Sequence, residues 1–133
     1  MSARILIADD SELIRSAIAS LIRGLGHEVC GEVSDGAAAI QKAFELKPDL
    51  LILDVAMPRR NGWSAALELR ASLPSLPILF YTLLPSEFLD AEAKRVGFLG
   101  VVQKDNANAL IAAIRAALES RPADEDGAEA ATA

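Results

Sequence analysis

Residues 50–62, LLILDVAMPRRNG, decide the fold of this chain. Four large aliphatic residues lead directly into Asp54, and a proline and a glycine soon follow. A short, uninterrupted apolar run of this kind is typical of a strand buried on both faces, as in a parallel sheet. A carboxylate at the end of such a strand either caps the next turn or is held at the rim of the sheet for chemistry. The rest of the chain helps to decide between these two interpretations.

Short apolar segments alternate with longer segments of helical period along the whole chain. Strands are expected at residues 4–8, 27–33, 50–53, 77–81 and 99–103. Helical patterns follow them, clearest at Leu13, Ile14, Ala17, Ile18, Leu21 and Ile22 and at Leu110, Ile111, Ile114 and Leu118, and least regular at 86–96. Because each crossover between parallel strands lays a helix on the sheet, the pattern predicts an α/β fold with a doubly wound, five-stranded parallel sheet.

Length and composition indicate one domain followed by a tail. The 133 residues, 52% of them hydrophobic, suffice for one core, expected over residues 1–121. Residues 122–133, PADEDGAEAATA, have no large apolar side chain and are expected to form a disordered acidic tail or linker. The formal net charge of −6 argues against direct nucleic-acid binding. A single cysteine, the lack of a membrane-spanning run and the lack of a signal-peptide pattern predict a cytoplasmic protein without a membrane partner.

The ends of the expected strands supply the candidate site, because ligands bind at the carboxyl ends of strands in such folds. The first strand delivers Asp9 and Asp10, the third Asp54, the fourth Thr82 and the fifth Lys104. One strand-end aspartate would be explained well as a helix cap, but five polar residues at five expected positions would not. Crowded carboxylates suit Mg²⁺, and an aspartate can attack phosphorus while a metal and a lysine offset phosphoryl charge. The set predicts phosphoryl chemistry.

These residues, together with the segments ADDS (8–11), DVAMP (54–58) and NG (61–62), resemble the signature of bacterial response-regulator receiver domains over about residues 4–120. The resemblance is to single-domain, chemotaxis-type regulators, and it implies a flavodoxin-like (βα)₅ fold. It implies that Asp54 accepts a phosphoryl group from a sensor histidine kinase or a histidine phosphotransfer protein. Asp10, Asp54 and the main-chain carbonyl of Ala56 would bind Mg²⁺, and Asp9 would act on it mostly through water.

The same resemblance implies what the remaining site residues do. Thr82 would move to bond the phosphoryl group, and Lys104 would pair with it. Such a domain is a signalling phosphoacceptor rather than an enzyme, although it can catalyse its own phosphorylation and dephosphorylation. Phosphorylation would change the surface that binds a downstream protein, whose identity the sequence does not give. The chain is either a stand-alone receiver or part of a longer protein.

Three positions depart from the family pattern. Val101 stands where a switch aromatic is usual, and Asp105 follows the lysine where a proline in a cis peptide is usual. A cis bond without proline costs roughly 3 kcal/mol, so we expect a trans bond and an altered start of the last helix. Leu83 is bulkier than the residue that usually follows the threonine, and it could narrow the path to Asp54. The switch region, Leu83 and Val101, therefore bears on the output and on the phosphorylation rate, not on the fold.

Two other interpretations stay open. Because of Val101 and Leu83, the chain could instead be a receiver-like interaction module with phosphate-independent or atypical output. An unrelated enzyme, either a nucleotide-binding oxidoreductase or a phosphohydrolase, is less favoured. The turn after the first strand, residues 8–11, lacks the glycine-rich phosphate cradle of a dinucleotide fold. Phosphohydrolases of similar fold carry their nucleophile after the first strand in an Asp-x-Asp pattern, which is absent here.

Overall fold

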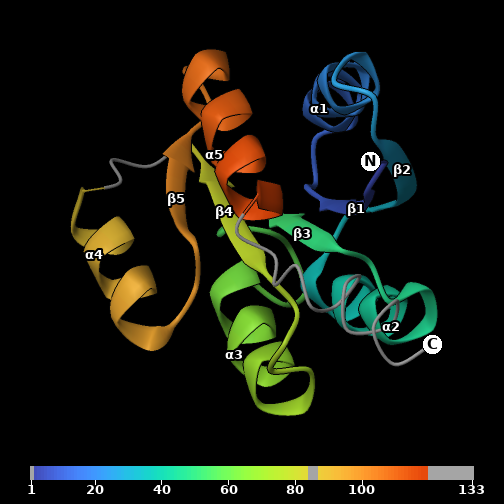
Figure 1. Ribbon diagram of the computed structural model, residues 1–133. Coiled ribbons are helices and arrows are strands. Elements are labelled where there is room, and N and C mark those ends of the chain that lie inside the picture. The colour runs from blue at the N-terminus through green and yellow to red at the C-terminus, as the bar shows by residue number, and fades with distance from the viewer. Residues whose placement is uncertain (1, 84–86, 120–133) are drawn as a thin grey trace, which may run out of the picture.

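The computed structural model describes residues 2–83 and 87–119. They form one five-stranded parallel sheet of strand order β2-β1-β3-β4-β5 with helices on both faces (Figure 1). The strands are β1 (Arg4–Ala8), β2 (Glu28–Val33), β3 (Leu50–Leu53), β4 (Ile78–Thr82) and β5 (Gly100–Gln103). The helices are α1 (Glu12–Gly24), α2 (Gly36–Leu46), α3 (Gly62–Ser72), α4 (Glu87–Val96) and α5 (Ala107–Glu119). The predicted doubly wound α/β fold is confirmed, and the expected tail at 122–133 lies outside the described residues.

The strand order places the site. After β2 the chain returns to the opposite side of β1, so the order reverses between β1 and β3. Ala8 and Leu53 are paired at the carboxyl ends of these two strands, and the Asp54 N–H donates to the Ala8 carbonyl at 2.9 Å. A crevice forms where crossovers leave in opposite directions, which is where ligands bind in open α/β sheets. Asp9 and Asp54 follow directly from this pair.

Two apolar clusters, one on each face, hold the sheet rigid. Side chains of α1 and α5 pack on one face, and those of α2, α3 and α4 pack on the other. On the second face Trp63 stacks on Phe80 with ring centroids 5.3 Å apart, and Phe98 meets Phe80 edge-on at 5.2 Å. All four residues of β3 are buried. The apolar strand before Asp54, β3, is therefore the central strand of the sheet and is buried, as its sequence predicts.

The loop after β3 is closed tightly by its last residues. Asn61 caps α3, because its side chain accepts from the Ser64 N–H at 2.8 Å. Gly62 donates its N–H to the Val55 carbonyl at 2.7 Å, and a Cβ at this position would lie 1.8 Å from the Asp54 carbonyl oxygen. Only glycine fits there. Within the described ranges, we find no helix whose length and apolar character would let it cross a membrane.

Candidate functional site

Three carboxylates meet at the carboxyl edge of the sheet. Asp9 and Asp10 follow β1 and Asp54 follows β3, and one carboxylate oxygen from each lies within 4.8 Å of the others. Asp9 and Asp54 are 1% and 5% exposed, whereas Asp10 is open to solvent. Asp9 is held in place because its Oδ1 accepts from the Ser11 N–H at 2.8 Å. The predicted grouping of the three aspartates is therefore present.

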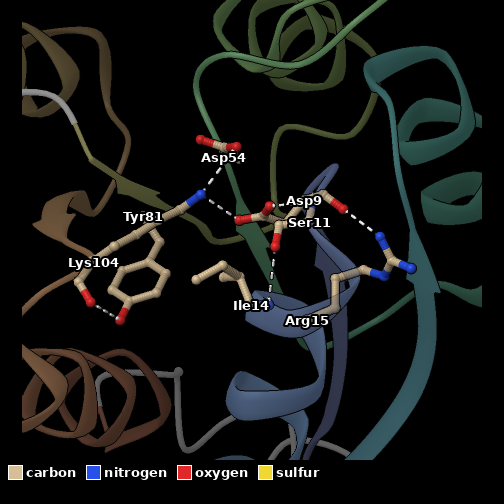
Figure 2. Close-up of polar contacts among 7 residues, drawn as sticks. All are labelled: Asp9, Ser11, Ile14, Arg15, Asp54, Tyr81 and Lys104. Carbon is tan, nitrogen blue, oxygen red and sulfur yellow. Dashed lines mark hydrogen bonds and ion pairs between the residues drawn. The ribbon is translucent and has the colours of Figure 1, made fainter.

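Lys104 lies between the two buried carboxylates (Figure 2). Its Nζ is 2.5 Å from Asp9 Oδ2 and 3.1 Å from Asp54 Oδ2, and only 5% of its side chain is exposed. Thr82 is buried at the end of β4, and its carbonyl accepts from the Lys104 N–H at 2.8 Å. The five residues that the sequence singled out thus lie at the same edge of the sheet.

Burial and the neighbouring charges shift the pKa values of both Asp54 and Lys104. Burial raises the pKa of Asp54, and the neighbouring charge of Asp9 raises it further, against the lowering effect of Lys104 and of the Ala56 main-chain N–H. For Lys104, burial lowers the pKa, but the hydrogen bonds and charges of Asp9 and Asp54 outweigh it and leave the pKa raised. One ammonium thus serves two buried carboxylates, while Asp10 adds a further negative charge beside them.

The donor set fits a hard cation. Asp9, Asp10 and Asp54 offer oxygen atoms only, which Mg²⁺ prefers, and the exposure of Asp10 leaves room for bound water. In the described part of the chain, the Lys104 ammonium is the partner found for Asp9 Oδ2. Carboxylates in such numbers are common on surfaces without an ion, but two of these three are buried.

An ion pair that the sequence did not point to joins the loop after β3 to the turn after β2. Arg59 donates from Nε and Nη2 to Asp35 Oδ2 at 3.0 and 2.6 Å, and the Gly36 N–H donates to the Arg60 carbonyl at 2.9 Å. Arg59 has a left-handed φ of 64°, which is uncommon for a non-glycine residue. The loop that carries Ala56 is therefore fastened at its far end.

Known proteins identify this arrangement. Residues 5–115 match the family model described as the response regulator receiver domain. The chain belongs to that family. It is 42% identical over 101 residues to the transcriptional regulatory protein PdtaR of Mycobacterium tuberculosis, covering 76% of this chain and 49% of PdtaR. It is 34% identical over 97 residues to the chemotaxis protein CheY of Thermotoga maritima, covering 73% of this chain and 81% of CheY.

Solved receiver structures agree with this assignment. A LuxR-family two-component response regulator from Aurantimonas superposes with a TM-score of 0.84 at 29% identity, covering 91% of this chain and 88% of that one. The response regulator domain of Thermotoga maritima CheB superposes with a TM-score of 0.81 at 29% identity, covering 92% and 100%. The flavodoxin-like receiver fold is confirmed. The chain spans about half the length of PdtaR, so this relative carries sequence beyond the receiver domain.

The structure shows the contacts of Val101 and Leu83, the two positions that the sequence singled out as a switch region. Val101 is buried in β5, and its N–H donates to Asp90 Oδ1 of α4 at 2.8 Å. Leu83 is 74% exposed. The Lys104–Asp105 peptide bond is trans, as expected, and α5 begins after Asn106, which accepts from the Ala109 N–H at 2.9 Å. A polar contact therefore ties α4 to the edge strand β5 at Val101.

Proposed function

We propose that this receiver domain takes a phosphoryl group onto Asp54 and changes its partner-binding surface in response. The donor is a sensor histidine kinase or a histidine phosphotransfer protein, as receiver domains in general use. In the transfer, an Asp54 carboxylate oxygen attacks phosphorus, the P–N bond to the donor histidine breaks and a P–O bond forms. The electron pair of the broken bond stays on the histidine nitrogen. The product on this chain is an aspartyl phosphate.

The other site residues have supporting roles in this proposal. Lys104 pairs with a phosphoryl oxygen, and Thr82 moves to donate its hydroxyl to another, so that both offset the charge on the transferred group. Their places at the ends of β5 and β4 support these roles, as does the 3.1 Å distance from the Lys104 ammonium to Asp54 Oδ2. The same groups let the domain catalyse its own phosphorylation by small donors and its later hydrolysis. It is otherwise a signalling phosphoacceptor rather than an enzyme.

Mg²⁺ is the cation that we assign to the acidic cluster. Asp10, Asp54 and the main-chain carbonyl of Ala56 would bind it, and Asp9 would act on it mostly through water. The ion supplies charge neutralisation for the phosphoryl oxygens. The cluster geometry supports this, since the three carboxylates present oxygen atoms within 4.8 Å of one another.

One observation carries the proposal: the buried ammonium of Lys104 reaches both Asp9 and Asp54 at the edge of the sheet, where the strand order reverses. Intact mass after incubation with Mg²⁺ and acetyl phosphate tests it, and the wild type should gain one phosphoryl group. Asp54→Asn should fold but gain none, and its thermal stability should match or exceed that of the wild type because a repelling charge is gone. Asp105→Asn is the control, because it removes an exposed carboxylate near the site, and it should be phosphorylated normally. Undiminished phosphorylation of Asp54→Asn would place the acceptor elsewhere.

A phosphate-independent interaction module is the second candidate, and Val101 favours it. The valine is stiff at χ1 and cannot carry a hydroxyl between buried and exposed positions as a tyrosine can. If this candidate is right, the wild type gains no phosphoryl mass and its binding surface is constant. In either case the downstream partner is a protein. We place the domain in the cytoplasm, without a membrane partner, because its single cysteine suits a reducing compartment. Its net charge of −6 argues against nucleic-acid binding of its own.

A further inference from the structure

Tyr81 joins β4 to the residue that carries the site's ammonium. It is the penultimate residue of β4 and only 7% exposed, and its ring packs in the cluster formed with α1 and α5. Its hydroxyl donates to the main-chain carbonyl of Lys104 at 2.9 Å (Figure 2). Thr82 follows Tyr81 in the strand, so the two side chains project to opposite faces. The hydroxyl of Tyr81 therefore reaches Lys104 from the face opposite to Thr82.

The main chain of Lys104 is anchored on both sides by consecutive residues of β4. Its N–H donates to the Thr82 carbonyl at 2.8 Å, and its carbonyl accepts the Tyr81 hydroxyl. Lys104 lies one residue beyond the last paired residue of β5, and its N–H makes the backbone bond to β4 described above. The next peptide bond, to Asp105, is trans, and no proline ring restrains it. The Tyr81 hydroxyl is thus the contact that orients the Lys104 carbonyl.

We propose that Tyr81 is a positioning residue for Lys104, holding its main chain so that the ammonium lies between Asp9 and Asp54. This rests on the proposed function, in which Lys104 meets the phosphoryl group. A lysine reaches its target on a flexible four-carbon stem, so a rotated main chain shifts the ammonium or adds conformers to it. Misplacement of a reacting or stabilising group by about 1 Å can cost a large factor in rate.

The surroundings of Tyr81 suit a permanent anchor. Burial raises the pKa of its hydroxyl, so the group stays a protonated donor throughout the neutral range. An aromatic ring has few rotatable bonds, and this one belongs to the buried apolar cluster that includes Ile18 of α1 and Ile114 of α5. Among the described residues, the hydroxyl oxygen has one hydrogen-bond partner, the Lys104 carbonyl, at normal hydrogen-bond length. Removing only that atom therefore isolates the anchor from the packing.

Tyr81→Phe is the deciding variant, because it keeps the ring and deletes the hydroxyl. The maximal rate of phosphorylation by acetyl phosphate, with donor and Mg²⁺ both saturating, should fall about 3- to 10-fold, the range that one net hydrogen bond covers. Mg²⁺ affinity, measured by calorimetry, should not weaken, since Lys104 competes with the cation for Asp9 and Asp54. Leu118→Ala, which trims the same cluster at the far end of α5, should lower the melting temperature without changing the rate.

A second pair of variants shows whether Tyr81 acts through Lys104. In a Lys104→Met background, Tyr81→Phe should cause no further loss of rate. The nitrogen resonance of the Lys104 ammonium gives a readout that needs no phosphate, and it should shift or broaden in Tyr81→Phe. An unchanged rate with an unchanged resonance would overturn the proposal, as would an equal loss in the Lys104→Met background.

The proposed function can fail separately from this inference. If the wild type gains no phosphoryl mass, the phosphoacceptor role is lost and the ammonium resonance alone decides on Tyr81. A shifted or broadened Lys104 signal in Tyr81→Phe would then support the positioning role. An unchanged signal would refute it.

Discussion

Mg²⁺ should stabilise this domain, and Asp10 should account for most of the effect. The cluster holds three carboxylates with oxygen atoms within 4.8 Å, against one ammonium that pairs with Asp9 and Asp54. At that distance, two unit charges repel by about 1 kcal/mol at the dielectric constant of water and about 3 kcal/mol at an effective value near 20. Asp10 is exposed, so its repulsion belongs near the lower figure. Asp10→Asn should therefore raise the stability of the metal-free domain slightly.

Linkage gives the size of the metal effect. At a Mg²⁺ concentration ten times the dissociation constant, binding to the folded state adds about 1.4 kcal/mol, which corresponds to a rise of about 5 °C in the melting temperature of a domain this size. If Asp10→Asn weakens binding tenfold, the same concentration adds only about 0.4 kcal/mol, or roughly 1–2 °C. Thermal melts at constant ionic strength, with and without Mg²⁺, measure both shifts.

Glu12→Gln is the matched control for this experiment. Glu12 is an exposed carboxylate in the first turn of α1, and the described cluster does not include it. Its loss removes the same charge close to the site, so it should leave the Mg²⁺-dependent shift nearly intact. Equal shifts in Asp10→Asn and the wild type would refute the assignment of Asp10 as a ligand. Equal losses in Asp10→Asn and Glu12→Gln would show that only diffuse charge attracts the ion.

Two further predictions concern contacts outside the acidic cluster. The hydrogen bond from the Ala38 N–H, and after it the one from Arg59, lowers the pKa of Asp35 in the folded state. The ionised carboxylate therefore stabilises the fold at pH values above its unfolded pKa of about 3.9. This stabilisation is lost as the pH falls through the lower pKa of the folded state. Asp35→Asn, which can still cap α2, should be less stable than the wild type at neutral pH but converge with it in acid unfolding; a constant gap would contradict this. Asp90→Ala should cost about 1–2 kcal/mol in denaturant unfolding and speed amide exchange at Val101, and an unchanged Val101 amide would show that the tether is unimportant.

The fold was predictable because its signals are local and repeated. Each strand is a short apolar run, and every strand boundary lies within one residue of its expected position. The order of polar residues along the chain, with one or two at each of four strand ends, was enough to predict that they meet. Parallel strands bring their carboxyl ends to one edge whatever the details of the helices. Hence the grouping of Asp9, Asp54 and Lys104 followed from topology alone.

The contacts that orient these residues were not predictable in the same way. Tyr81 reads as an apolar strand residue, and nothing in the sequence says that its hydroxyl meets a carbonyl 23 residues later. Arg59 and Asp35 lie 24 residues apart in two different loops, and their pairing depends on how those loops are folded. The left-handed φ of Arg59 is likewise invisible in a residue type that usually avoids it. The sequence pattern predicts where the site residues lie along the strands, but the contacts that orient their side chains depend on tertiary geometry.

Because Val101 stands where a switch aromatic is usual, we expect the signal of phosphorylation to travel along the main chain of β5. Lys104, at one end of this route, is bonded to the Thr82 carbonyl, so a shift at the end of β4 also moves Lys104. Val101 lies three residues earlier, and its N–H is held by Asp90 of α4. Because β5 is an edge strand with one neighbour, it has more freedom to shift than β3. The effect of a phosphoryl group on Asp54 would then reach α4 through the hydrogen bond between Val101 and Asp90. A beryllofluoride mimic should therefore change amide exchange along Glu87–Val96 more than at Val101 itself. A response confined to Val101, with α4 unchanged, would show that the tether does not pass the signal on to α4.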